Sequence, residues 1–257
     1  MRPPHDASHS DAWTSPNPRG VTLLELLVVL VLGGILMGSA LSLLSTVASG
    51  VAKGMERWDR LEATRTVWVT LERELRPGLE GRDWRVGPDG TLSLRAFRGF
   101  ARICGPPGER GRYPVAWRGE RLPVPDRDSL LVLGRDGGWR SAALSVWSEG
   151  EVGCAPTGGE REGWMAWVGA GSETPVLVRL FERGSYSVHA GAFRYQRGAA
   201  GRQPLTPEVF GQGSRIHRGP EAVEAELVPR PPPRQLNGGR PPSTRVRIWV
   251  GGTDGAF

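Results

Sequence analysis

The apolar run from Leu26 to Ala52 constrains the fold of this chain more than any other feature of its sequence. No charged residue interrupts the run until Lys53. At a rise of ~1.5 Å per residue, an α-helix of this length crosses the ~30 Å hydrocarbon core of a bilayer. A carboxylate, Glu25, directly precedes the run, and an unpaired charge in lipid costs about 2.5–3.5 kcal/mol on insertion scales. The sequence therefore predicts a membrane helix whose start carries a charge that a plain anchor would avoid.

The helical pattern continues beyond the apolar run. Side chains that can face a core recur at spacings of three and four until Arg76, and Pro77-Gly78 then breaks the helix. This stripe is too short for the sustained heptads of a coiled coil, so we expect it to pack against a sheet. Its members are Leu61, Thr64, Val67, Trp68, Leu71 and Leu75.

After the break, the chain alternates apolar and polar residues with the period of two that is typical of β-strands. Asp89-Gly90 is a turn signal, and Arg183-Gly184 predicts a second turn that would fold Val176–Tyr195 into a hairpin. Loops rich in Gly, Pro and Arg are expected at Gly105–Pro114 and Pro229–Pro242. The predicted strands are Thr91–Phe97, Ser129–Leu133, Arg140–Trp147, Trp164–Val168, Val176–Glu182, Ser185–Tyr195, Ala222–Val228 and Thr244–Val250. The fold class expected is α+β, with a long N-terminal helix packed on a β-rich antiparallel head.

The chain has two cysteines, Cys104 and Cys154, and both follow the membrane helix. If this part of the chain lies outside the cytoplasm, a disulfide between them is the simplest expectation. Two unrelated buried thiols are the alternative. Two cysteines without a nearby pair of histidines do not make a zinc site.

The sequence offers no set of residues that predicts catalysis. The four histidines have no ligand spacing, and no Walker loop is present, so the chain cannot be an assembly motor. Asp126-Arg127-Asp128 falls short of the six to eight oxygens that Ca²⁺ takes, and a solvated turn is the stronger interpretation. We therefore expect no enzyme activity, no cofactor and no metal.

The segment from Gly20 to Glu25, followed by the unbroken apolar helix, resembles the class III signal of the type IV filament superfamily, which comprises type IV pilins and type II secretion pseudopilins. The resemblance implies that prepilin peptidase cuts after Gly20, that the new N-terminus at Val21 is methylated, and that Glu25 serves filament assembly. It also implies other pilin or pseudopilin subunits and an inner-membrane assembly platform as partners. The remainder of the chain resembles a large minor pilin or minor pseudopilin in its layout.

Four segments are expected: a cleaved leader (1–20), the membrane half of the helix (21–52), its amphipathic half (53–76) and the head (77–257). A secretory signal cut near Ala40 or Ser49 is the alternative, but Glu25 would interrupt its apolar core. Counting charges does not decide the orientation, because Lys53, Arg57 and Arg60 rival the two arginines of the leader. The resemblance implies a leader in the cytoplasm and a head outside it, in the periplasm or beyond.

The favoured function is that of a non-enzymatic minor subunit of a type IV pilus-like or type II secretion-like filament. One alternative is an inner-membrane binding protein or enzyme held by an uncleaved signal anchor. Another is a DNA-binding tip pilin of a competence pilus, in which arginines and tryptophans would be functional. Nucleic-acid binding is not favoured, because the net charge of +6 comes from arginines scattered along the sequence and the tryptophans occupy core-like positions.

Overall fold

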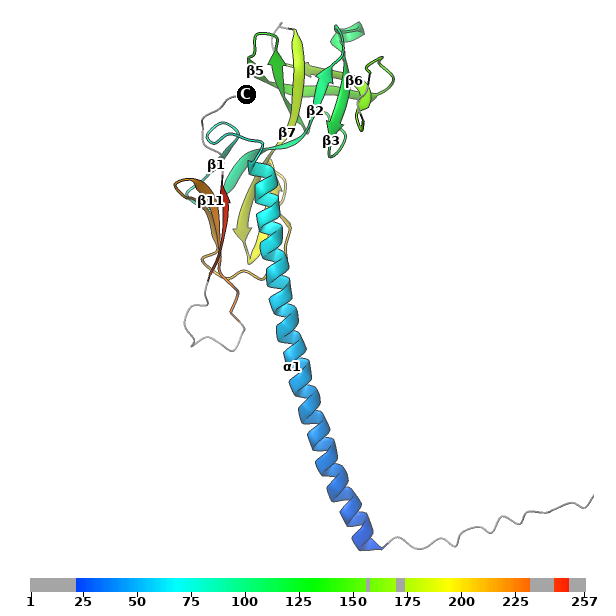
Figure 1. Cartoon of the computed structure of the whole chain (residues 1–257), viewed down its shortest axis with the longest axis vertical. Helices are drawn as coiled ribbons and strands as arrows, with labels where there is room; N and C mark the ends of the chain where they lie inside the picture. The colour runs from blue at the N-terminus through cyan, green and yellow to red at the C-terminus, as the bar shows by residue number, and fades with distance from the viewer. Residues whose placement is uncertain (1–21, 156–157, 170–173, 232–242, 250–257) are drawn as a thin grey trace, which may run out of the picture. The chain divides into compact units, whose positions relative to one another are not determined.

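The computed structural model describes residues 22–155, 158–169, 174–231 and 243–249, so Gly20 and Val21 lie outside the described residues. The helix α1 (Leu23–Leu75) precedes a series of strands (Figure 1). The chain divides into two compact units, residues 1–54 and 55–257. The first contains the apolar part of α1, and the second contains the rest of α1 and all the strands that the structure describes.

The last turns of α1 bury one face in the second unit. Ala63, Val67, Leu71 and Leu75 are almost fully buried, and their spacing of four places them on a single stripe of the helix. The helix ends at Leu75, just before Pro77, which cannot continue the backbone hydrogen-bond ladder. The structure thus confirms an α+β fold in which the long N-terminal helix packs on a β-rich antiparallel domain.

The strands form two antiparallel sheets. In the larger sheet, β2, β3, β6, β5, β4 and β7 pair in that order, and pairing between β2 and β7 closes these six strands into a barrel. β1 pairs with the first residues of β2, β8 pairs with the last residues of β7, and β9 pairs with β8. β10, β11 and β12 form the second sheet. The strands are β1 (Trp84–Val86), β2 (Leu92–Ile103), β3 (Tyr113–Gly119), β4 (Ser129–Gly134), β5 (Trp139–Glu149), β6 (Arg161–Val168), β7 (Pro175–His189), β8 (Ala192–Arg197), β9 (Gln203–Pro204), β10 (Arg215–Arg218), β11 (Ala222–Leu227) and β12 (Thr244–Trp249).

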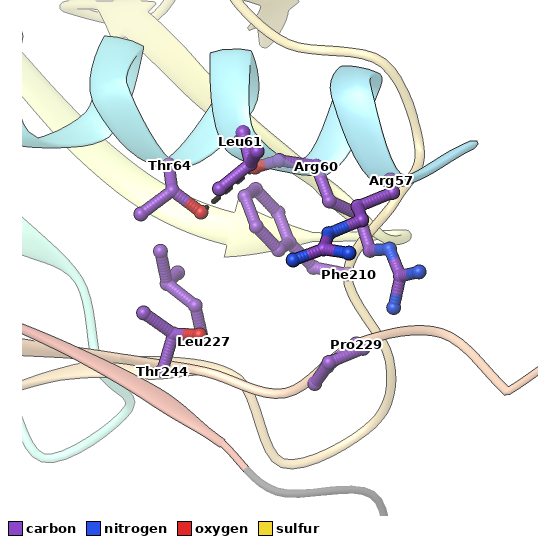
Figure 2. A pocket seen from close by; sticks show the side chains of 8 residues that line it. All are labelled: Arg57, Arg60, Leu61, Thr64, Phe210, Leu227, Pro229 and Thr244. Carbon is purple, nitrogen blue, oxygen red and sulfur yellow. Dashed lines mark hydrogen bonds between the residues drawn. The ribbon is translucent and has the colours of Figure 1, made fainter. Parts of the chain in front are cut away.

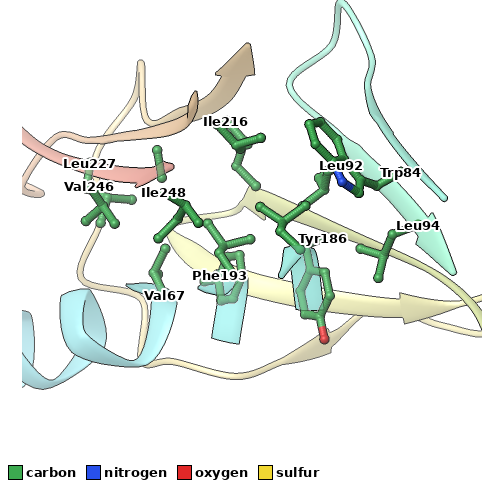
Figure 3. Packing of buried hydrophobic residues seen from close by; sticks show 14 of the residues in the cluster. Val67, Trp84, Leu92, Leu94, Tyr186, Phe193, Ile216, Leu227, Val246 and Ile248 are labelled. Carbon is green, nitrogen blue, oxygen red and sulfur yellow. The ribbon is translucent and has the colours of Figure 1, made fainter. Parts of the chain in front are cut away.

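Two hydrophobic cores follow from this topology. The first lies between α1, the start of β2 with the end of β7, and the β10–β12 sheet. Val67, Phe193 and Ile248 are part of this buried cluster (Figure 3). The second fills the barrel, with Trp117, Leu130 and Leu180 among its buried members. β2 and β7 are long enough to contribute side chains to both cores.

The prediction of a hairpin turn at Arg183-Gly184 is wrong. β7 runs through both residues without interruption, because Arg183 pairs with Arg95 and Gly184 with Leu94 on β2. Gly184 serves close packing instead, since a Cβ there would lie 2.5 Å from the Tyr195 ring. The true turn is Ala190-Gly191, where φ is +49° and +78°. Two successive residues with positive φ fit the type I′ turn that two-residue hairpins prefer.

The expected loops need correction as well. Tyr113 and Pro114, placed in a loop by the sequence, begin β3, while the tight segment before them includes Gly111 at φ +68°. Most of the loop expected at Pro229–Pro242 lies outside the described residues. The strand β3 was missed altogether, although it has seven residues. The short strands β1, β9 and β10 were also missed, because two to four residues carry too little periodicity to detect.

The two cysteines form a disulfide that fastens the barrel. Cys104 follows the end of β2, and Cys154 lies in the connection between β5 and β6. Their Cα atoms are 5.5 Å apart with a sequence separation of 50 residues. The bond predicted from the sequence is therefore present, and it ties together two parts of the barrel that are not neighbouring strands.

Removing this disulfide is expected to lower the free energy of unfolding by about 4 kcal/mol, because the cross-link restricts a long loop in the unfolded chain. The variant Cys104→Ser/Cys154→Ser can be compared with the wild type by urea unfolding in nonionic detergent, followed by tryptophan fluorescence. Reducing the wild-type protein should lower its stability to that of the variant. Equal stability of oxidised and reduced wild type would contradict the expectation.

Candidate functional site

The start of α1 has the geometry of a capped helix. The Thr22 hydroxyl accepts a hydrogen bond from the backbone N–H of Glu25 at 3.3 Å. Thr22 stands directly before the first helical residue, and a Thr at this position followed three residues later by Glu is a capping box. The sequence carries this signal as well as the resemblance that assigns Glu25 to assembly. Glu25 therefore has a structural interpretation beside the functional one.

The apolar part of α1 presents hydrophobic side chains on all sides. Its most apolar window has a mean hydropathy of 2.5 and no residue buried within the protein. By length and composition, α1 can cross a membrane. Within it, Gly33, Gly34 and Gly38 have no atom near the place where a Cβ would stand. Small residues of this kind allow close approach of another helix.

The last turns of α1 carry a second apolar face that is exposed. Trp58, Leu61 and Val69 are 70%, 58% and 46% exposed, although Val67 and Leu71 on the opposite face are fully buried. Trp58 and Leu61 are three positions apart, and Val69 lies about two turns beyond Leu61, so they share one side of the helix. Core packing, the expectation for most tryptophans, holds for Trp84 and Trp117 but is wrong for Trp58, Trp68 and Trp249. The stripe predicted to pack on the sheet is therefore correct at Val67, Leu71 and Leu75 but wrong at Leu61 and Trp68.

A pocket of about 250 Å³ opens between α1 and the β11–β12 end of the second sheet (Figure 2). Leu61 and Thr64 of α1 face Leu227 across it, and the guanidinium groups of Arg57 and Arg60 lie at one end. Arg60 Nε donates to the Glu56 carbonyl at 3.3 Å. The pocket can receive an apolar side chain that has an anionic group beside it. Phe210, Pro229 and Thr244 complete its lining.

A buried ion network lies where β2 and β7 pass from one core to the other. Arg98 Nε donates to Glu182 Oε1 and Arg98 Nη1 to Glu74 Oε1, both at 2.9 Å. Arg98, Glu74 and Glu182 are each less than a tenth exposed. Their charges come from β2, α1 and β7, so the network connects the end of the helix to both long strands.

A β-bulge explains how Arg98 reaches the interior. Phe97 pairs with Phe181 and Gly99 with Leu180, which leaves Arg98 as the extra residue on β2. Before the bulge, even-numbered residues such as Ala96 face the core, and after it the odd-numbered Ala101 does. The bulge therefore allows β2 to face both cores and places a guanidinium at the point of change.

Further groups complete the network. Arg127 Nη2 donates to Glu182 Oε2 at 3.0 Å, and Arg121 donates to both carboxylate oxygens of Asp128 at 2.6 Å. Asp128 is 3% exposed and both of its oxygens are engaged, so the prediction of a solvated turn at Asp126-Arg127-Asp128 is wrong for this residue. No group of three possible metal ligands occurs among the residues that the structure describes.

The network shifts the pKa values of Glu182, Tyr186 and Tyr195. Burial alone would raise the pKa of Glu182, but hydrogen bonds from Arg98 and Arg127 outweigh it and hold this pKa below the ordinary value. Burial and the neighbouring Glu74 raise the pKa of Tyr186, whose hydroxyl donates to Glu74 Oε1 at 3.1 Å. Burial and Glu182 likewise raise the pKa of Tyr195. Each group thus keeps one charge state at neutral pH, which suits a structural clamp and not proton transfer.

Comparison with known families identifies one part of the chain. Residues 16–41 match the family model described as the prokaryotic N-terminal methylation motif. Comparisons with curated proteins and with solved structures found no match. The matched segment contains Gly20, Val21 and Glu25, of which the structure describes Glu25. The methylation motif, together with the long apolar helix that carries it, fits a type IV pilin or pseudopilin.

Proposed function

We propose that this chain is a minor structural subunit of a type IV pilus-like or type II secretion-like filament. The observation that carries the proposal is the methylation motif at residues 16–41, which leads into a continuous helix ending on a β-rich head. Prepilin peptidase would remove residues 1–20, and Val21 would become the methylated N-terminus. The mature chain would wait in the inner membrane until a platform and other subunits draw it into the filament.

The surface of α1 supports a role in assembly. Its apolar part has no partner within the described chain, and Trp58, Leu61 and Val69 extend an apolar face into the part of the helix that contacts the head. In a filament, helices of neighbouring subunits would cover both surfaces. The disulfide supports a head outside the cytoplasm, because such bonds persist mainly in oxidising compartments.

Processing is the first test of this function. Mass spectrometry of the membrane-extracted protein should find a mature chain that starts at Val21 and carries an N-terminal methyl group. The variant Gly20→Arg should keep its leader, because the peptidase would lose the residue it cuts after. Asn17→Arg adds the same charge within the leader but leaves Gly20 in place, so it should be processed as the wild type.

Two outcomes would contradict the proposal. A chain that keeps Met1 in cells with an active prepilin peptidase would indicate an uncleaved anchor. A chain that starts near Ala40 or Ser49 would indicate an ordinary secretory signal.

A further inference from the structure

The outer face of the larger sheet carries a polar groove. Ser93, Ser185 and Gly198 are among its lining residues, and the groove has a volume of about 400 Å³. We define the arginine groove by four guanidinium-bearing residues that line it: Arg82, Arg85, Arg95 and Arg183. Although these residues are scattered in the sequence, strand pairing brings them onto one surface.

Strand register explains this gathering. Arg85 of β1 pairs with Ser93 of β2, Ser93 with Ser185 of β7, and Ser185 with Gln196 of β8. These four side chains therefore form one row across the sheet, and strands are about 4.8 Å apart, so the row is about 14 Å long. Arg202 Nε donates to the Gln196 side chain at 3.3 Å, which adds a cation at the far end.

The positive charges of the arginine groove exceed its negative charges. Asp83 is the acidic residue in the lining, and it is already engaged by Arg95 at 3.2 Å and by the backbone N–H of Leu79 at 3.0 Å. Among the described residues, no carboxylate lies within ion-pair distance of Arg82, Arg85 or Arg183.

The pairing of β2 with β7 places two positive charges next to each other, which destabilises the sheet. Arg95 and Arg183 stand directly opposite each other, and like charges at such positions destabilise a sheet. Burial lowers the pKa of Arg179, Asp83 acts in the opposite direction, and Arg82 contributes a smaller lowering. An anion bound in the groove would relieve this repulsion.

The residues that line the groove favour a nucleic acid over an acidic protein as its partner. Stable interfaces between proteins have aromatic or aliphatic anchors at their centre. In the arginine groove the lining exposes mainly polar surface, and its two large apolar residues, Trp84 and Leu94, are buried in the core behind it. Charge and hydroxyl donors suit the phosphate backbone of a nucleic acid better than a folded protein partner.

From this geometry we infer that the arginine groove binds the phosphate backbone of single-stranded nucleic acid without reading its sequence. Proteins that bind single strands without sequence preference use a positively charged groove that tracks the backbone. Because no base-stacking aromatic residue is exposed in the described lining, binding depends on charge, with a dissociation constant on the order of micromolar. This inference does not depend on the filament function and holds for a membrane-anchored monomer.

Fluorescence anisotropy with a labelled oligothymidine of about 20 nucleotides, added to the full chain in nonionic detergent, tests the inference. Wild type should bind, and the affinity should fall steeply with salt. Arg85→Gln/Arg183→Gln should weaken binding about tenfold or more and reduce the slope of log affinity against log salt by about 1.4, since each phosphate contact contributes about 0.7.

The control is Arg110→Gln/Arg118→Gln, which removes the same charge from exposed barrel residues outside the groove. It should bind as the wild type. Circular dichroism melts of both variants check that the fold is kept. A polyglutamate peptide of equal charge serves as competitor, and it should compete at least tenfold more weakly than unlabelled oligothymidine. Absence of oligonucleotide binding, equal loss in both variants, or stronger competition by polyglutamate would each overturn the inference.

Discussion

Replacing Arg98 with methionine is expected to destabilise the head by about 3–5 kcal/mol, the usual cost of removing one partner from a buried ion pair. The reason is the pair of carboxylates that would be left behind. Glu74 and Glu182 both accept hydrogen bonds from Arg98 at 2.9 Å, and both are nearly inaccessible to water. Without the guanidinium, Glu182 keeps Arg127 at 3.0 Å, but among the described residues Glu74 keeps only Arg73 at 3.4 Å and the Tyr186 hydroxyl at 3.1 Å.

Urea unfolding of the full chain in nonionic detergent measures this loss, with tryptophan fluorescence as the signal. Arg161→Met is the matched control, because Arg161 pairs with Glu149 at 3.3 Å where both side chains are more than half exposed. Exposed pairs contribute about 0–1 kcal/mol, so the control should remain close to the wild type. A loss below about 1 kcal/mol for Arg98→Met would contradict a stabilising role of the buried ion network.

The pH dependence of stability provides a second measurement of the same network. The pKa of Glu182 is lower in the folded protein than in the unfolded chain, where a Glu titrates near about 4.3. Its contribution to stability is therefore present above this value and is lost as the pH falls towards the folded pKa. Removing Arg98 should reduce this acid sensitivity, since Arg98 is the first of the hydrogen-bond donors that lower the pKa of Glu182.

The helix and the location of most strands could be predicted from the sequence, because each follows from a local period. The apolar run and the stripe through Val67 and Leu71 have the period of a helix, and Pro77 ends it. The prediction of a turn at Arg183-Gly184 was wrong because it too used local sequence alone. Arg183-Gly184 resembles a turn in isolation, but pairing with β2 across a long sequence separation keeps the strand straight.

The barrel and the ion network could not be predicted. Closure depends on β2 pairing with β7, and this register places Leu92 opposite Tyr186, residues far apart in sequence. Arg98 has no sequence signal, because a bulge shifts its strand by one residue and reverses the face on which it lies. The arginine groove was missed for a related reason: charge along the sequence is scattered, and the sheet register gathers it.

Replacing Glu25 with valine is expected to leave membrane insertion and leader cleavage intact while incorporation into filaments falls at least about tenfold. In the proposed filament the helix enters an apolar bundle, where an unpaired carboxylate is costly. The positive amine at Val21, in the same chain or a neighbour, is the partner we propose. At ~4 Å and an effective dielectric constant near 20, such a pair attracts by about 4 kcal/mol, enough to set the register of smooth apolar helices. Pull-down of partner subunits from membranes measures incorporation.

The cap at Thr22 requires a variant that separates charge from capping. Glutamine can replace Glu in a capping box but carries no charge, so Glu25→Gln should keep the start of the helix and still fail to assemble. Thr22→Val removes the hydroxyl that accepts the Glu25 N–H, at a cost of about 0.5–2 kcal/mol to the helix, and should assemble nearly as the wild type. If Glu25→Gln assembles normally and Thr22→Val does not, the carboxylate serves the cap and not the register. If only the two Glu25 variants fail, the charge itself selects the position of this helix among its neighbours.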